Sequence, residues 1–318
     1  MILCVTLNPC LDRTLTVPSW QPGDLVRGTA VREVVGGKGN NVARALKRLG
    51  RSARPLTFLG GPVGRVCEHL LASEDGLDPI VIPSKSPTRV ILTVRTGTTS
   101  EQSAFFDPDP AILRAEAEAM LRAVESALGG GTVEALTLSG SSPSPATHEL
   151  FSEMIGMARS HRIPAFLDTY GPALSAIWGF WPTAMQLNRR EAAAFARRPG
   201  FSDADALALL QNWQSRGVEW GAITDGPRPA MFLAHGKKYR ATPPEVEAVN
   251  PIGSGDSMLA GAVDGRLRGM GPESMIRHAM GCAVANAMTW DAGALDPDEV
   301  ERWADEVGIE PMGQAGSP

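Results

Sequence analysis

The sequence lacks the features that mark disulfide-rich proteins, zinc proteins and membrane proteins. Its four cysteines are scattered without a CxxC pair, which predicts reduced thiols in a cytoplasmic protein and no zinc site. Its five histidines include no HExxH motif. No apolar run is long enough to cross a bilayer, so we expect no membrane partner. The formal net charge is -5 with no basic block, which argues against nucleic acid as a partner.

Short apolar runs alternate with helical patterns along nearly all of the 318 residues. This βαβα order predicts one large α/β domain whose mostly parallel sheet is covered by helices on both faces. The expected strands are Ile2–Leu7, Pro55–Leu59, Ala135–Leu138, Pro164–Leu167, Ala184–Leu187 and Gly221–Thr224. Helical patterns lie between them, for example over Ala111–Leu128 and His148–Arg159.

Two stretches break this alternation and predict a second, smaller sheet. Leu15–Val35 and Arg89–Phe106 are rich in Val, Thr and Phe, with the partial alternation of antiparallel strands. We expect them to project from the main domain. The tail after Gly308 is rich in Pro and Gly and is expected to be frayed.

Small, polar or acidic residues follow the expected strands of the large sheet. Ligands of doubly wound sheets bind beyond the carboxyl ends of the strands, so this row of residues predicts a polar cleft. Turn formation alone would explain any single one of them. The residues are Asn8-Pro9, Gly60-Gly61, Ser139-Gly140-Ser141, Asp168-Thr169, Asn188 and Asp225-Gly226.

The sharpest motif follows Glu245–Val249, a segment that alternates like a strand. In Gly253-Ser254-Gly255-Asp256, the glycines allow backbone N–H groups to turn toward one point, ahead of small apolar residues typical of a buried helix. The positive end of the helix dipole adds to this anion hole, which suits the charge on a transferring phosphate. Asp256 at its edge could accept a proton from an attacking hydroxyl. The motif alone is equally compatible with an ordinary helix N-cap.

A second glycine-rich segment, Gly36–Asn41, leads into an amphipathic helical pattern that ends at Gly50. Its glycines permit close approach of a ligand, and Lys38 and Asn41 offer donors to a polyol or phosphate. The segment is not a Walker A motif, and no dinucleotide fingerprint follows the first strand, which disfavours a dehydrogenase. The basic residues of the helix are expected mostly on its solvated face: Arg44, Lys47 and Arg48.

Together these motifs resemble those of the ribokinase/PfkB carbohydrate kinase family, and the resemblance covers nearly the whole chain. Gly-Gly-Lys-Gly-x-Asn followed by Val-Ala-Arg is similar to the first family signature, and Ile252–Asp256 is similar to the second. The opening, Val5–Pro9 and then Leu11–Thr14, resembles the 1-phosphofructokinase and tagatose-6-phosphate kinase branch. Further segments fall in the family's order: Leu138–Ser141, Asp168-Thr169, Asn188–Glu191 and Thr224–Gly226.

The resemblance implies a fold and an activity. The fold is a three-layer αβα sandwich of ribokinase type, as a single kinase domain over 1–318 with a lid formed by about 13–35 and 87–107. The activity is transfer of a phosphoryl group from ATP, with Mg²⁺, to a hydroxyl of a ketohexose phosphate. Lids of this family often pair between subunits, so the resemblance also implies a homodimer.

The resemblance further implies a role for each matching residue. Asp256 is expected to be the catalytic base, beside an anion hole formed by Gly253, Ser254 and Gly255. The residues expected to bind the sugar are Asp12, Gly37, Lys38 and Asn41, with Arg89 and Arg27 as candidates for a substrate phosphate. The residues expected at the ATP are Asn188, Glu191, Thr224, Gly226 and Asn286, with Glu191 reaching Mg²⁺ through water.

Three positions depart from the pattern of this branch. Gln186-Leu187-Asn188 replaces the usual Lys-Pro-Asn and removes a cation near the nucleotide phosphates. Asn250-Pro251 replaces residues of the Thr-Val type before the anion hole, and Asp107–Pro110 adds negative charge near the sugar site. Two alternatives therefore stay open. One is a kinase for a neutral sugar or nucleoside, and the other is a catalytically weak protein that binds a sugar phosphate.

Overall fold

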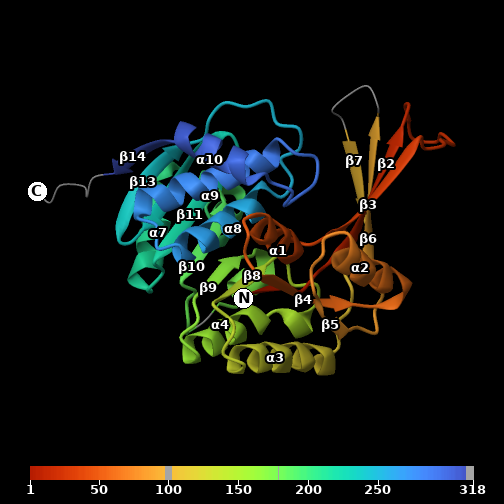
Figure 1. Ribbon diagram of the computed structural model, residues 1–318, viewed down its shortest axis with the longest axis horizontal. Coiled ribbons are helices and arrows are strands. Elements are labelled where there is room, and N and C mark those ends of the chain that lie inside the picture. Colours follow the sequence, from red (N-terminus) through yellow and green to blue (C-terminus); the bar gives the residue numbers. More distant parts are fainter. Residues whose placement is uncertain (97–101, 178, 313–318) are drawn as a thin grey trace, which may run out of the picture.

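A computed structural model describes residues 1–96, 102–177 and 179–312. Within them, one large sheet has a parallel part, formed by β1, β4, β5, β8, β9, β10 and β11, and an antiparallel part in which β12, β13 and β14 follow β11 (Figure 1). Its order is β14 (Gly308–Met312), β13 (Lys237–Thr242), β12 (Arg228–Ala234), β11 (Trp220–Asp225), β10 (Ala184–Asn188), β9 (Ala165–Asp168), β8 (Ala135–Ser139), β1 (Ile2–Thr6), β4 (Ala53–Leu59) and β5 (Ile80–Pro83).

Helices cover both faces of this sheet and enclose two separate hydrophobic cores. One face carries α1 (Lys38–Arg48), α2 (Gly61–Ser73), α8 (Ser254–Leu267), α9 (Pro272–Ala287) and α10 (Pro297–Glu306). The other carries α3 (Arg114–Gly129), the short η1 (Pro145–Thr147), α4 (Leu150–Ser160), α5 (Gly171–Ser175), α6 (Arg189–Ala196) and α7 (Asp203–Ser215). Successive residues of a strand point to opposite faces, so Phe166 lies in one core and Leu167 in the other. The expected three-layer αβα sandwich is confirmed.

A second sheet stands apart from the large one, at the upper right of Figure 1. Its order is β3 (Ala30–Gly36), β2 (Cys10–Val17), β6 (Arg89–Thr96) and β7 (Gln102–Phe106). Each hairpin is antiparallel as expected, but β2 and β6 join the two hairpins in parallel. The sheet begins at Cys10, before the expected lid boundary at 13. We refer to these four strands and the described residues that connect them as the lid, and residues 97–101 of the expected lid range lie outside the described residues.

Two local expectations are wrong. The segment Gly308–Met312 is not frayed, because it pairs with β13 as the edge strand β14, and the rest of the expected tail, 313–318, lies outside the described residues. The segment Glu245–Val249 forms no strand: Val246 packs on the core, Val249 is 52% exposed, and the N–H of Val249 donates to the carbonyl of Ala287. Alternation without a neighbouring strand to pair with does not make a sheet. Among the described helices, none is long and apolar enough to cross a membrane.

Candidate active site

The strand register brings the predicted polar residues to one edge of the large sheet. Ser139 of β8 pairs in register with Asp168 of β9, and Asn188 of β10 pairs with Thr224 of β11. These are the last or nearly last residues of parallel strands, so their side chains lie at the carboxyl edge, where ligands of such sheets bind.

The first turn of α8 presents free backbone donors at this edge. Gly253 precedes the helix with φ at 85°, and a Cβ there would lie 2.5 Å from Cβ of Ala292, so only glycine fits. The N–H of Ser257 already donates to the carbonyl of Gly253. Among the described residues, no backbone acceptor faces the N–H of Gly255 or Asp256. Such orphan donors at a helix start can bind an anion.

Asp256 lies in this first turn, and its side chain is buried. Oδ2 accepts a hydrogen bond from Nδ2 of Asn41 at 2.7 Å, and within the described ranges Oδ1 has no donor. Burial raises the pKa of Asp256 to about 7, against the charges of Lys38 and Arg44 and the Asn41 bond, while Asp168 adds to the rise. A carboxyl group that titrates near neutrality can act as a general base.

Lys38 enters the site from the first turn of α1. Gly39 lets this turn approach β1 closely, since a Cβ there would lie 2.5 Å from the carbonyl oxygen of Val5. Nζ of Lys38 lies 2.8 Å from Oδ1 of Asp168 and 3.8 Å from Oε1 of Glu191. Burial alone would lower the pKa of Lys38, but nearby carboxylates, first that of Asp168, outweigh burial and raise it. Lys38 therefore stays charged.

Gln186 and Asp168 belong to the same cluster. The sequence placed Asp168 only in the predicted polar cleft and Gln186 only as a departure from the family pattern, and it gave neither of them a role in the site. Nε2 of Gln186 donates to Oδ2 of Asp168 at 2.8 Å and to the carbonyl of Gly255 at 2.7 Å. Oε1 of Gln186 is buried and has no partner within the described part of the chain. The position of Asp168 at a strand exit was the one sequence signal that could have revealed it. Gln186 thus connects the lysine cluster to the first turn of α8, the predicted anion hole.

Asn188 and Glu191 form a reciprocal cap at the start of α6. Oδ1 of Asn188 accepts from the N–H of Glu191, and Oε2 of Glu191 accepts from the N–H of Asn188, both at 2.9 Å. The other carboxylate oxygen, Oε1, faces Lys38. Burial raises the pKa of Glu191, and Lys38 opposes this rise. Thr224 lies beside Asn188, and Gly226 forms the exposed turn after β11 with φ at 61°.

Asp12 lies on β2 at the base of the lid and is half-buried. Sγ of Cys10 lies 3.5 Å from Oδ1 of Asp12, and burial raises the pKa of this carboxyl group. The lid also contacts the loop after α9, through an ion pair of Arg32 with Asp291 and through Arg95, whose guanidinium lies 4.0 Å from the ring centre of Trp290. The lid is therefore held against the loop after α9 by residues beyond its base, since Arg32 pairs with Thr14 and Arg95 with Thr16 in the lid sheet.

The two arginines predicted for a substrate phosphate are not brought together. Arg89 begins β6 at the base of the lid, where it pairs with Asp109 at 2.9 Å and donates to the carbonyl of Asn8 at 3.3 Å. It also lines a pocket of about 310 Å³ between residues 86–89 and 107–111. Arg27 lies in the exposed connection between β2 and β3, at the opposite end of the lid strands. Only Arg89 therefore adjoins the rest of the predicted site in one chain.

Asn286 is completely buried in α9, beneath the anion-hole loop. Its Nδ2 donates to the carbonyl of Ile252 at 2.9 Å, and its Oδ1 accepts from Oγ of Ser257 and the N–H of Gly293. These bonds hold the segment that leads into α8. Contact of Asn286 with an adenine ring stays a prediction.

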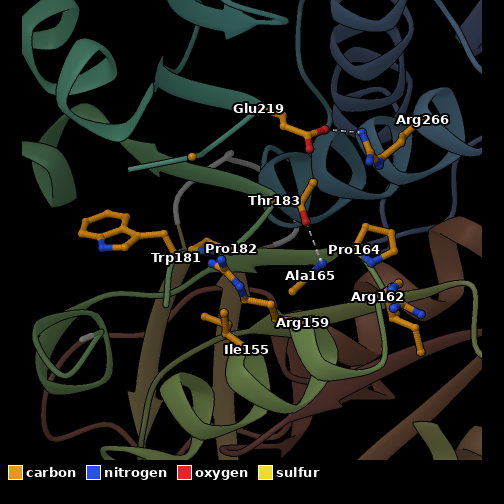
Figure 2. A pocket seen from close by; sticks show the side chains of 12 residues that line it. Ile155, Arg159, Arg162, Pro164, Ala165, Trp181, Pro182, Thr183, Glu219 and Arg266 are labelled. Atoms are coloured by element: carbon orange, nitrogen blue, oxygen red, sulfur yellow. Dashed lines mark hydrogen bonds and ion pairs between the residues drawn. The ribbon is translucent and has the colours of Figure 1, made fainter. Parts of the chain in front are cut away.

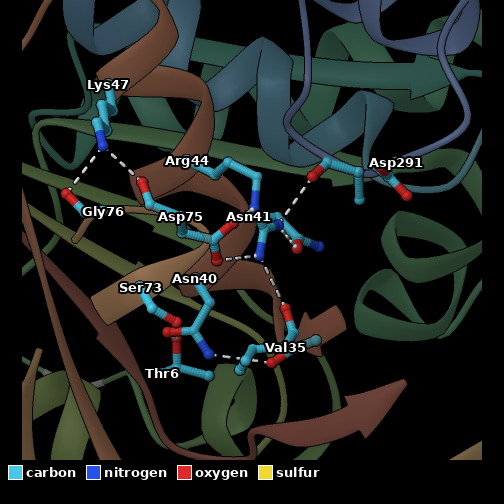
Figure 3. A network of polar contacts seen from close by, with 12 residues as sticks. Thr6, Val35, Asn40, Asn41, Arg44, Lys47, Ser73, Asp75, Gly76 and Asp291 are labelled. Carbon is cyan, nitrogen blue, oxygen red and sulfur yellow. Dashed lines mark hydrogen bonds and ion pairs between the residues drawn. The ribbon is translucent and has the colours of Figure 1, made fainter. Parts of the chain in front are cut away.

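The expectation that Arg44 is solvated is wrong. Arg44 is buried, with 8% of its surface exposed, and it makes a polar network under the site (Figure 3). Helix α1 packs against α8 as well as the sheet, so its outer face is covered as well. Lys47 is exposed, with Nζ bonded to the carbonyls of Asp75 and Gly76, and Arg48 is exposed.

A pocket of about 270 Å³ lies at the opposite, amino edge of the large sheet (Figure 2). Ala165 starts β9, Thr183 precedes β10 and Glu219 precedes β11, where it pairs with Arg266 at 2.7 Å. None of the predicted site residues lines this pocket. The candidate active site is therefore at the carboxyl edge.

Comparison with known proteins agrees with this geometry. Residues 3–298 match the model of the pfkB family carbohydrate kinases. Phosphofructokinase-2 from Escherichia coli in complex with potassium is 26% identical, with a TM-score of 0.87 over 96% of this chain and 98% of that chain. The same enzyme in complex with fructose-6-phosphate gives a TM-score of 0.83 at the same coverage. A Thermotoga maritima protein with 1-phosphofructokinase in its name is 21% identical, with a TM-score of 0.86 over 98% of this chain and 100% of that chain, a likeness of fold.

Proposed function

The chain belongs to the pfkB family of carbohydrate kinases, and we propose that it transfers the terminal phosphoryl group of ATP to a hydroxyl of a ketohexose phosphate. In this proposal the whole chain acts as one kinase domain, and the lid covers the sugar. The observation that carries the proposal is the position of Asp256. Its carboxylate lies in the first turn of α8, within hydrogen-bond distance of Asn41 and beside the N–H groups of Gly255 and Asp256, which have no backbone acceptor among the described residues.

The chemistry follows from this position. Oδ1 of Asp256 accepts the proton of the sugar hydroxyl as its oxygen attacks phosphorus. The N–H groups at the start of α8 stabilise the negative charge on the transferring phosphoryl oxygens. Lys38 adds a fixed positive charge, held in place by Asp168. ADP leaves, and the proton on Asp256 passes to solvent.

The carboxylate of Glu191 could bind the water shell of a hydrated Mg²⁺. One of its oxygens caps α6, and Oε1 is left to accept hydrogen bonds from metal-bound water. When bound with ATP, Mg²⁺ neutralises the phosphate charges. Asn188, Thr224 and Gly226 lie along the same edge and would line the nucleotide site, with Asn286 supporting the loop nearby.

Arg89 supports an acceptor that already carries a phosphate. It is the arginine at the base of the lid, close to Asn8 at the end of β1. The side chain of Asp109, its ion-pair partner, is 46% exposed, so an incoming phosphate could compete with Asp109 for the guanidinium. Escherichia coli phosphofructokinase-2 is described in complex with fructose-6-phosphate, which agrees with such an acceptor.

The same ion pair favours one alternative, a kinase for a neutral sugar. Asp109 already balances the charge of Arg89, so a neutral acceptor would leave no unmatched cation there. The other alternative, a weakly catalytic protein that binds a sugar phosphate, depends on the neutral Gln186 where the branch usually has a lysine. The neutral-sugar alternative predicts a different order of substrates from the main proposal, and the weakly catalytic alternative predicts binding without turnover.

A homodimer through the lid is part of the proposal. The lid exposes large apolar side chains that a single chain leaves in water: Val31 at 60%, Phe105 at 51% and Phe106 at 64%. Arg27 at the far end of the lid could then approach the partner's site. Sedimentation at micromolar concentration tests this arrangement, and a monomer would contradict it.

The substrate assignment is tested by coupled ADP release over a panel of acceptors. Fructose 1-phosphate, fructose 6-phosphate and tagatose 6-phosphate are compared with free fructose and ribose, each with ATP and Mg²⁺. We expect kcat/KM to be highest for one of the sugar phosphates. Better turnover of a free sugar would support the neutral-sugar alternative, and no turnover with binding would support the weakly catalytic one.

A further inference from the structure

All five N–H bonds of the Arg44 guanidinium have acceptors. Nε and Nη2 donate to the two carboxylate oxygens of Asp75 at 2.8 and 2.7 Å, and Nη2 also donates to the carbonyl of Val35 at 3.1 Å. Nη1 donates to Oδ1 of Asn41 at 3.0 Å and to the carbonyl of Ala292 at 2.8 Å (Figure 3). The side chain is buried. Because every N–H group of the planar guanidinium donates to an acceptor, Arg44 is held in one orientation beneath the site.

This fixed guanidinium determines which way the amide of Asn41 points. A guanidinium can only donate, so the atom of Asn41 that faces Arg44 must be the oxygen. The amide nitrogen then faces Oδ2 of Asp256, to which it donates at 2.7 Å. An unconstrained amide could turn over and present its oxygen to the carboxyl group instead. That arrangement would favour the protonated carboxyl, which cannot accept a proton.

We propose that Arg44 is a positioning residue for phosphoryl transfer: it holds the Asn41 amide in the orientation that favours the ionised form of Asp256 and leaves Oδ1 to the sugar hydroxyl. This inference rests on the proposed function, in which Asp256 is the general base. Arg44 does not itself touch a reacting atom, since Asn41 lies between it and the carboxylate. Its effect should therefore appear in the ionisation of the base.

The charges around Asp256 give the direction of that effect. Lys38 and Arg44 reach it from α1, and Asp168 reaches it from β9. Burial raises the pKa of Asp256 to about 7, and the Asn41 hydrogen bond and the charge of Arg44 both lower it. Removing Arg44 weakens both lowering effects at once. The Asp256 pKa should rise further, so the enzyme should need a higher pH to work.

A purely structural role is the alternative, and Asp75 provides the matched control. Arg44 and Lys47 both bond to Asp75, tying α1 to the turn after α2. Replacing Asp75 by Asn removes the ion pair but keeps an oxygen that can accept from the guanidinium, which also keeps its bonds to Asn41, Ala292 and Val35. Asp75→Asn should lower thermal stability without moving the pH dependence of catalysis.

The experiment measures kcat/KM for the best acceptor from pH 5.5 to 9.5 in the full-length wild type, Arg44→Met, Arg44→Lys and Asp75→Asn. The acid limb is the low-pH part of the profile, where kcat/KM rises with pH. In Arg44→Met this limb should move up by about one pH unit, the effect of roughly a tenfold change in the proton affinity of Asp256. Activity lost at pH 6.5 should largely return at pH 9. Arg44→Lys keeps the buried charge without the fork, so its limb should move less, and it tests the inference if Arg44→Met does not accumulate as folded protein.

Two further outcomes complete the test. If both Arg44 variants keep the wild-type limb while kcat falls equally at every pH, Arg44 is only structural and the inference is overturned. Asp256→Asn, assayed in parallel, separates this inference from the proposed function. Retained turnover in Asp256→Asn overturns the proposed function and the role of Arg44 with it. Loss of turnover together with unmoved Arg44 limbs overturns the role of Arg44 alone.

Discussion

Nε2 of Gln186 lies 2.8 Å from Oδ2 of Asp168, and the same nitrogen lies 2.7 Å from the carbonyl oxygen of Gly255. One amide therefore joins the carboxylate that holds Lys38 to the loop that we propose as the anion hole. A lysine in the position of Gln186 would place a charge between the same two acceptors. The neutral side chain keeps the connection and omits the charge.

The first prediction concerns this connection. Gln186→Met should remove both hydrogen bonds, leave two acceptors with fewer partners, and destabilise the fold by about 1–3 kcal/mol. Gln186→Lys should keep the fold, because an ammonium can donate to both acceptors. We also expect it to lower KM for ATP through the added charge. Thermal melting and steady-state kinetics on both variants check this, and equal melting temperatures for Gln186→Met and wild type would contradict it.

The second prediction concerns pH. Burial raises the pKa of Asp256 to about 7, and only the ionised form can accept the hydroxyl proton. The rate should therefore rise with pH and level off above about pH 8, one unit past this pKa. The measurement is kcat/KM for the sugar acceptor at saturating Mg²⁺-ATP between pH 5.5 and 9. A rate that is flat across pH 6–8 would show that Asp256 does not titrate there.

The third prediction concerns Glu191. Glu191→Gln retains a side-chain oxygen for the helix cap but removes the negative charge that faces Lys38 and the proposed Mg²⁺ water shell. The Mg²⁺ concentration needed for half-maximal rate should increase, while the melting temperature changes little. The check is a Mg²⁺ titration at constant free ATP. An unchanged requirement would reduce Glu191 to a helix cap.

The fourth prediction concerns Arg89. Arg89→Ala should weaken binding of the sugar phosphate by about 1.5–3 kcal/mol, the usual worth of a hydrogen bond to a charged group. ATP binding should stay the same. Calorimetric titration with each ligand checks this, with the exposed surface variant Arg114→Ala as the control. Equal losses for the phosphorylated and the free sugar would contradict a phosphate contact.

Most of the fold could be predicted from the sequence because its signals are local. Apolar runs marked β1, β4, β8, β9, β10 and β11 of the large sheet but not β5, β12, β13 or β14. The residues after the predicted strands, such as Asp168 and Asn188, marked the edge where ligands of such sheets bind. Edge strand β14 was missed because its formation depends on β13, a partner more than sixty positions away in the chain. Strand pairing of that kind leaves no pattern within the segment itself.

The site was predicted less completely than the fold. The motifs named Asp256, Asn41 and Lys38, which the structure brings together. Helical periodicity placed Arg44 toward solvent, because periodicity cannot reveal that a second layer of chain covers the outer face of a helix. The bridge from Gln186 to Asp168 depends on neighbouring strands in register and could be found only in three dimensions.

In the proposed function Asp256 is the general base of a sugar kinase, and the variant Asp256→Asn isolates that role. The measurement is the rate of ADP release by Asp256→Asn and by wild type, with the best acceptor of the panel, alongside the Kd of each protein for ATP. The account predicts that the substitution lowers kcat by roughly 10²–10⁴-fold, the usual range for loss of a general base, and leaves the Kd for ATP nearly unchanged. Turnover by Asp256→Asn near the wild-type rate would contradict it.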